Sequence, residues 1–121
     1  MIKLKGRLLN LNSIDVCGRK WSKNCKISFP DKIPVLYNFQ HNIPPCGFAK
    51  IHKDKHGLEC EVELSGEIPI DNAYVGGCYT NIESHSEFSV TVIDSCKLIS
   101  MSIVPDDQVV DRNLKIRRSE R

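Results

Sequence analysis

Strict alternation of apolar and charged residues is the feature of this sequence that most restricts its fold. In GLECEVEL at 57–64, glutamates separate the apolar residues Leu58, Cys60, Val62 and Leu64. A repeat of two residues is the pattern of a β-strand with one buried and one exposed face. The preceding FAKIHKDKHG, at 48–57, leads into this strand through a turn at KDKHG. The two segments therefore predict a β-hairpin.

Four further segments carry strand signals. IKLKGRLLNL at 2–11 alternates, and its early lysines are typical of an edge strand. IPVLYNF at 33–39 is apolar, although Pro34 cannot donate to a ladder at its start. FSVTVID at 88–94 and KLISMSIVP at 97–105 are expected to pair around a turn at DSC.

Helix signals are weak. The segment 66–87 contains Pro69, Gly76 and Gly77, and it lacks a sustained period of 3.6 residues. NAYVGG within this segment would form at most one or two helical turns.

These signals predict the fold class and the domain organisation. We expect a mainly β fold, a small closed or partly open β-barrel of about six or seven mostly antiparallel strands with at most one or two short helices. At 121 residues the chain fits one domain. We place the barrel at 1–110 and a basic C-terminal tail at 111–121.

Six cysteines, at positions 17, 25, 46, 60, 78 and 96, are widely spread and form no C-x-x-C pair. The N-terminal MIKLKGRLLNLNSIDV has no apolar signal-peptide core, so we expect synthesis in the cytosol, where thiols stay reduced. We therefore predict six free thiols, with Cys60 buried as a small apolar side chain. Because no apolar run approaches the roughly 20 residues of a transmembrane helix, no membrane partner is expected.

The net charge is only +2, but it is distributed unevenly along the chain. Residues 1–56 carry eleven Lys/Arg and three Asp, residues 57–111 carry one Lys and eleven Asp/Glu, and residues 112–121 carry five Lys/Arg and one Glu. Such asymmetry can serve head-to-tail assembly of copies or contact with an acidic partner. The alternative is that folding brings the segments together and cancels their fields.

The sequence offers little for a metal, a cofactor or nucleic acid. His52, His56 and Cys60 are four residues apart, a helical ligand spacing, but a hairpin turn falls between them. His52 and Cys60 could face each other across the hairpin, which supplies only two ligands. Gly76-Gly77 has no phosphate-binding pattern downstream, stacking aromatics are few, and the central segment is acidic. We therefore expect no metal, no cofactor and no nucleic acid.

Nucleophilic catalysis needs a serine and a histidine that meet in space. His41 follows an apolar strand and precedes the turn-forming Pro44-Pro45, and Ser89 lies on the polar side of a later strand. Each also has a purely structural interpretation: His41 as a loop residue, and Ser89 as an exposed polar residue. Trp21, in the basic GRKWSK, is either a contact residue or a half-buried anchor.

Five segments stand in a recognisable order: NSIDVCGRKW at 12–21, IPVLYNFQHNIPPCGFAKI at 33–51, GLECEVEL at 57–64, FSVTV at 88–92 and KLISMSIVPDD at 97–107. Together they resemble the prohead (capsid maturation) proteases of tailed phages, whose fold is similar to the herpesvirus assemblin barrel. In that family D-x-x-G-D-x-V is followed by V-x-L-L-W-N-H-D … P-I-G-x-A and by an acidic strand that begins with Gly-Leu. The nucleophile strand S-V-G-F and the final L-L-E-V-S-L-V-P-x-P-A come last.

The resemblance implies a serine endopeptidase that cleaves capsid or scaffold protein during phage assembly. Ser89 would be the nucleophile and His41 the general base, with His85 or Asp94 as the third member. The resemblance also implies capsid or scaffold partners, neighbouring copies in an oligomer or lattice, and a location in the host cytoplasm during assembly or in the virion.

The sequence also departs from the family pattern. Phe39 and Gln40 are inserted before His41, and Ser100 stands where the final strand of the family has an acidic residue. The helix before the nucleophile strand is reduced to the glycine-rich 71–87. Loss of an orienting group can lower a rate by orders of magnitude while the fold stays intact. The alternative is therefore a catalytically inactive virion structural protein, a capsid auxiliary or decoration protein on the same fold.

Overall fold

In the computed structural model the chain is an all-β protein, described over residues 2–15, 17–40, 44–65, 72–105, 109 and 111–118. The described residues form eight strands and contain no helix, which confirms the predicted mainly β class. The strands are β1 (Ile2–Asn10), β2 (Arg19–Ser28), β3 (Lys32–Tyr37), β4 (Gly47–Asp54), β5 (Gly57–Leu64), β6 (Asn72–Glu87), β7 (Val90–Val104) and β8 (Lys115–Arg118).

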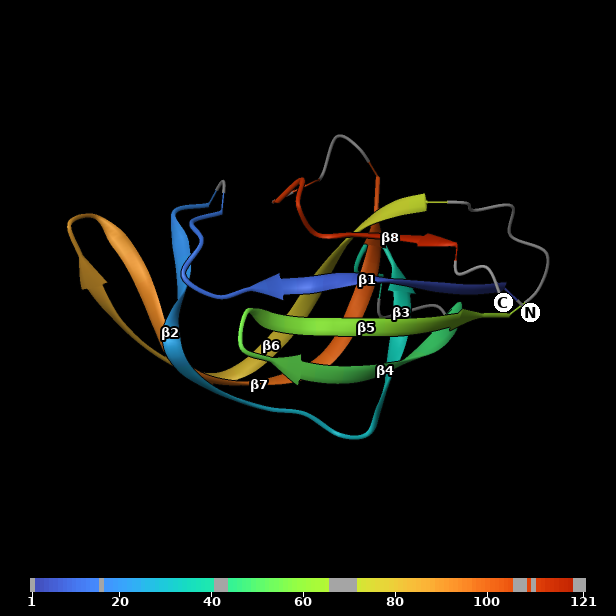
Figure 1. Cartoon of the computed structure of the whole chain (residues 1–121), viewed down its shortest axis with the longest axis horizontal. Coiled ribbons are helices and arrows are strands. Elements are labelled where there is room, and N and C mark those ends of the chain that lie inside the picture. Colours follow the sequence, from blue (N-terminus) through green and yellow to red (C-terminus); the bar gives the residue numbers. More distant parts are fainter. Residues whose placement is uncertain are drawn as a thin grey trace.

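Seven of these strands close into a barrel (Figure 1). The order around it is β7-β3-β4-β5-β1-β8-β6, and β6 pairs back with β7 to complete the ring. β2 lies outside the ring and pairs in parallel with the first half of β7. Six of the eight described pairings are antiparallel, and β7 makes both parallel ones, with β2 and β3. The predicted small, mostly antiparallel barrel is therefore confirmed.

The barrel interior is filled by the apolar faces of the alternating strands. The four apolar side chains of GLECEVEL are all buried, as the alternation predicts. Other strands contribute the fully buried Leu4, Leu8, Ile33, Ile93, Leu98, Met101 and Ile116. Burying one such side chain contributes about 1.5–3 kcal/mol relative to leaving it exposed, so this core is the main source of stability.

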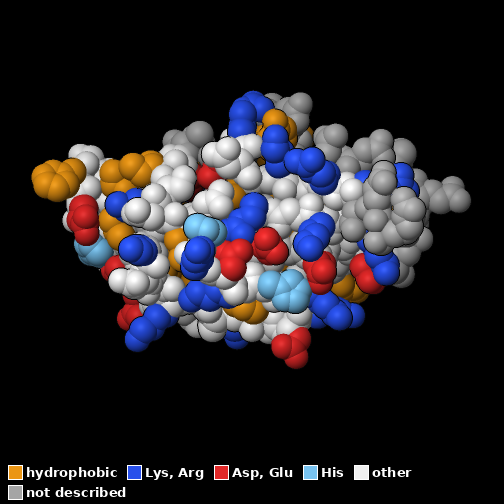
Figure 2. Space-filling model, in the orientation of Figure 1, with side chains coloured by type: hydrophobic (Ala, Val, Ile, Leu, Met, Phe, Trp, Pro, Cys, Tyr) orange, Lys and Arg blue, Asp and Glu red, His pale blue; other side chains and the backbone are white. Residues whose placement is uncertain are grey.

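The outward face of β5 explains part of the uneven charge. On the β1 side Lys5 is opposite Glu61, and on the β4 side Lys50 is opposite the same glutamate. His52 Nε2 also lies 3.0 Å from Glu61 Oε2. Figure 2 shows basic and acidic side chains interspersed over this face. Folding therefore brings oppositely charged segments together, and over these three strands their fields largely cancel.

β6 and β7 form one long hairpin whose outer half leaves the barrel. β7 pairs with β3 over residues 101–103, and β6 pairs with β8 over residues 72–74. Further out, residues 81–96 form what we call the hairpin arm, which is flanked by β2. Figure 1 shows the arm projecting from one end of the barrel.

The structure differs from two predictions for this region. A turn is predicted at 94–96, but β7 runs unbroken from Val90 to Val104. Residues 66–87 are predicted to be irregular or briefly helical, whereas 72–87 form β6. Register shifts between 78 and 84 disturb the alternation of β6, and Asn81 within them has φ 53°. Bulges of this kind interrupt the two-residue alternation by which a strand is recognised in a sequence. β6 is held in the sheet by its pairing with β7 instead.

The predicted basic tail is also part of the fold over residues 115–118. β8 pairs with both β1 and β6, so it closes the ring. Leu114 and Ile116, which alternate with basic residues, are buried. Residues 115–118, which we assigned to the tail, therefore lie within the sheet of the barrel. For the same reason β1 is not an edge strand, because it lies between β5 and β8.

All six cysteines are free, as predicted, and Cys60 is fully buried. Burial raises the pKa of the Cys60 thiol to about 12, so this group stays protonated and behaves as an apolar side chain. Among the described residues, no helix is long and apolar enough to cross a membrane.

Candidate functional site

Phe88 and Ser89 form the two-residue turn at the end of the hairpin arm. Their φ angles are 49° and 69°, both in the left-handed region, as the type I′ hairpin turn requires. The predicted strand FSVTV therefore begins two residues later, at Val90. Ser89 is exposed, and no described residue forms a hydrogen bond with its hydroxyl.

The predicted general base, His41, lies outside the described residues. The residues that lead to it are held at the far end of β7 from Ser89. Asn38 N–H donates to the carbonyl of Ile103 at 2.8 Å, and Phe39 N–H donates to Ser102 Oγ at 2.7 Å. The pairing of His41 with Ser89 stays a prediction.

The two candidates for the third catalytic member, His85 and Asp94, are in contact on the arm. His85 Nδ1 is 2.6 Å from Asp94 Oδ2, and His85 Nε2 is 2.5 Å from Glu87 Oε2. The hydrogen bond to Glu87 is the largest cause of a raised His85 pKa, and the one to Asp94 adds to it. Because a carboxylate occupies each ring nitrogen, the imidazole has no free nitrogen with which to take a proton from Ser89. Glu87 was missed, although its i, i+2 spacing from His85 on a strand indicates a shared face.

We expect His85 to titrate above its ordinary pKa of 6.5. Because the folded-state pKa is raised, the bridge stabilises the arm fully below pH 6.5 and loses this contribution as the pH rises through the folded-state value. An NMR titration of the His85 ring would measure the midpoint, and Asp94→Asn should move it back toward the ordinary value. A wild-type midpoint at or below 6.5 would show that the bridge does not form.

A cavity of about 330 Å³ opens between β1, β2, β6 and the segment 111–114. Its apolar walls include Leu9, Trp21, Phe39, Gly76, Tyr79 and Ile82. The rings of Trp21 and Tyr79 lie 5.2 Å apart between centroids, and the Arg19 guanidinium lies 5.3 Å from the Trp21 ring centroid. Trp21 is 5% exposed, so of its two interpretations the structure supports a buried anchor.

The polar groups around the cavity differ in whether they have hydrogen-bond partners. The Asp15 carboxylate pairs with the Arg19 guanidinium at 3.0 Å and accepts the Cys17 and Arg19 backbone N–H groups. The Tyr79 hydroxyl is buried, without a hydrogen-bond partner among the described residues. Burial raises the pKa of Tyr79, so the hydroxyl stays protonated and remains a hydrogen-bond donor. A Cβ at position 77 would lie 2.5 Å from that hydroxyl oxygen, so a larger residue there would have to displace the Tyr79 ring.

The predicted metal candidates are not brought together. Cys60 is buried, whereas His52 is exposed on the opposite face of the hairpin and pairs with Glu61. Within the part of the chain that the structure describes, no three His, Cys, Asp or Glu side chains are placed to hold a metal ion.

No protein-family model, curated protein or solved structure matches this chain. Its function is therefore inferred from its own residues and their geometry.

Proposed function

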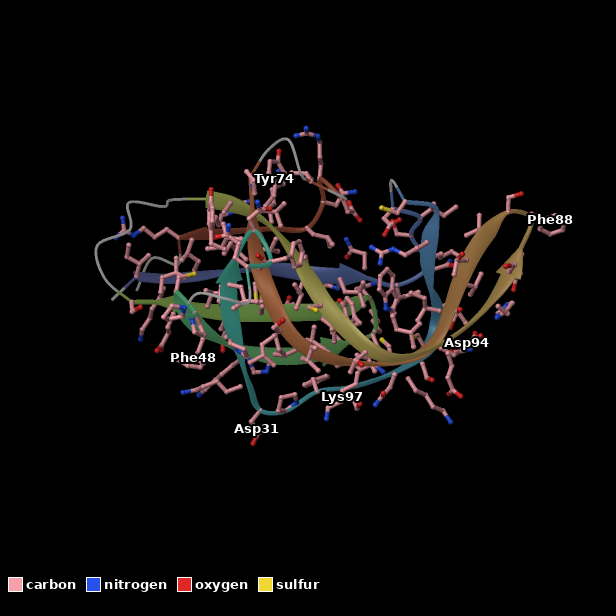
Figure 3. The ribbon with its side chains drawn as sticks, turned by 180° about the vertical axis from the view of Figure 1, so that it is seen from behind. Asp31, Phe48, Tyr74, Phe88, Asp94 and Lys97 are labelled. Atoms are coloured by element: carbon pink, nitrogen blue, oxygen red, sulfur yellow. The ribbon has the colours of Figure 1, made fainter. Side chains whose placement is uncertain are left out.

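We propose that the protein is a catalytically inactive structural protein of a phage capsid, an auxiliary or decoration protein that binds capsid or scaffold protein through its hairpin arm. The hairpin arm is the observation that carries the binding role, and the ordered sequence resemblance over 12–107 supplies the capsid context. The arm projects beyond the barrel and ends in Phe88, whose side chain is fully exposed at 101% (Figure 3). Large aromatic side chains of this kind dominate the energetics of protein–protein binding.

The backbone of the turn strengthens this argument. A left-handed conformation costs a non-glycine residue roughly 1–2 kcal/mol, and two-residue turns of this type favour Asn-Gly. Phe88 and Ser89 both adopt it. The chain therefore has an aromatic residue at a position where a turn-forming residue would make the protein more stable and more soluble. A binding role for Phe88 accounts for that choice.

The chemistry around Ser89 gives little support to catalysis. Among the described residues no base contacts its hydroxyl, and the nearby His85 is already bound by two carboxylates. Ser100, which stands where the resembled family has an acidic residue, is buried at 4% exposure, and no described residue pairs with its hydroxyl. An activated serine needs a base within hydrogen-bond reach and a group that orients that base.

The second candidate function is a serine endopeptidase of the prohead-protease type, with Ser89 as nucleophile and His41 as base. The ordered sequence resemblance over 12–107 favours it. Both candidates share capsid or scaffold protein as partner, and both act in the host cytoplasm during assembly. The inactive protein would additionally remain in the virion.

Ser89→Gly separates the two candidates. It removes the hydroxyl and suits the positive φ of the turn, whereas Ser89→Ala would keep a Cβ in the left-handed region. We expect particles assembled with the variant to contain the same capsid-protein fragments as wild-type particles, and to retain this protein at the same stoichiometry. Mass spectrometry of purified particles measures both. Loss of processing in the variant would establish the endopeptidase, and absence of the wild-type protein from particles would refute the structural role.

A further inference from the structure

The chain carries both halves of an aromatic insertion contact on separate parts of its surface. The first is Phe88, held out at the end of the hairpin arm, far from the barrel (Figure 3). The second is the apolar cavity lined by Trp21, Tyr79 and Ile82. Because the arm points away from the barrel, Phe88 cannot fill the cavity of its own chain.

The cavity matches an aromatic side chain in size and polarity. A cavity of roughly 150 Å³ with apolar walls binds benzene. The cavity here is about 330 Å³, which leaves room for a phenyl ring and part of the turn that carries it. Asp15 and Arg19 at its edge neutralise each other.

The two parts also carry opposite charge. The hairpin arm (residues 81–96) contains Glu83, Glu87 and Asp94 and has no Lys or Arg. Residues 112–118, which include the cavity-lining Leu114, contain four Lys/Arg and no Asp or Glu, and the charged residue of this part of the chain that lines the cavity itself is Asp111. Opposite charges around an apolar contact guide the approach of two surfaces and select their orientation.

We propose that Phe88 of one copy inserts into the cavity of a second copy of this chain. The inference rests on the binding role proposed for the arm, and it names a neighbouring copy as a partner of that arm. The two surfaces are different patches of the same molecule, so the contact is head-to-tail. Contacts of this type build closed rings or open filaments rather than simple two-fold dimers.

The double variant Phe88→Asn/Ser89→Gly tests the proposal without weakening the fold. It removes the aromatic ring and installs the residues that the turn prefers. We expect the wild type to form concentration-dependent oligomers in sedimentation velocity, and the double variant to remain monomeric while melting at the same or a higher temperature. Phe48→Ala is the matched control, because Phe48 is also exposed but lies on β4, away from both surfaces. The control should assemble like the wild type.

A mixing experiment tests the direction of the contact. Ser13→Trp places a large side chain at the wall of the cavity and leaves the arm intact. Alone, this variant should be monomeric. Mixed with the Phe88→Asn/Ser89→Gly variant, it should form a one-to-one heterodimer, because one partner keeps the arm and the other keeps the cavity.

Three outcomes would overturn the proposal: a monomeric wild type at the highest soluble concentration, assembly that survives loss of the ring, or a mixture without heterodimer. A monomeric wild type that still stays in particles would leave the proposed capsid function intact. Oligomers that do not stay in particles would support the head-to-tail contact and refute the capsid role.

Discussion

Gly6→Ala should lower the free energy of unfolding by about 3 kcal/mol, the upper range for forcing extra atoms into a packed site. Gly6 lies in the seam where β1 meets both β5 and β8. A Cβ at this position would lie 2.0 Å from the Lys115 carbonyl oxygen and 2.8 Å from the Ile116 Cα. Both are backbone atoms of the strand that closes the ring, so the clash is relieved only if β1 and β8 move apart. Urea unfolding would measure the loss, and amide exchange at Ile116 would report the loosening of β8.

Gly76→Ala is the matched control for this prediction. A Cβ at Gly76 would meet the Phe39 ring at 3.1 Å, and a side-chain ring can move where a backbone carbonyl cannot. We expect a loss well below that of Gly6→Ala. Equal losses in the two variants would show that the close approach of β8 to β1 is not what restricts position 6.

Strands with a clean alternation were predictable from the sequence, and strands with a broken one were not. In β5 each apolar residue faces the barrel interior. The eight residues of GLECEVEL therefore predicted both the buried face of this strand and its hairpin with β4. β2 was missed because Lys23, at the position in phase with the buried Trp21 and Cys25, is exposed, and because the register with β7 shifts between Trp21 and Lys26. β8 was missed because it is only four residues long, which is too short for a clear alternation. Its pairing with β1 and β6 holds it in the sheet.

The candidate site was predictable only in part, for a similar reason. The sequence offers His85 or Asp94 as the third catalytic member, and the structure places these two alternatives in contact with each other. It could not reveal that Ser89 lies in a turn, because the turn residues Phe88 and Ser89 are unusual for a type I′ hairpin. The cavity joins β1, β2, β6 and the segment 111–114, and such a meeting of distant segments depends on strand order.

Trp21→Ala should lower the free energy of unfolding by about 3–5 kcal/mol, as expected when a large buried aromatic is truncated. Trp21 joins β2 to the base of the arm, since it is opposite Ile93 of β7 and packs on the Tyr79 ring of β6. Its removal leaves a void between these strands and removes one wall of the cavity. Urea unfolding measures the global loss, and amide exchange along β2 should show that this strand is released from β7 first.

Trp21→Phe distinguishes packing from hydrogen bonding at this position. The indole Nε1–H is buried, faces the Cys96 thiol, which is a weak acceptor, and makes no well-formed hydrogen bond with a described residue. An unsatisfied buried donor costs free energy, so removing it offsets part of the packing that the smaller ring loses. Trp21→Phe should therefore be clearly less destabilising than Trp21→Ala. Equal losses would mean that the indole N–H makes a necessary interaction, and the packing account of the arm's attachment would then be wrong.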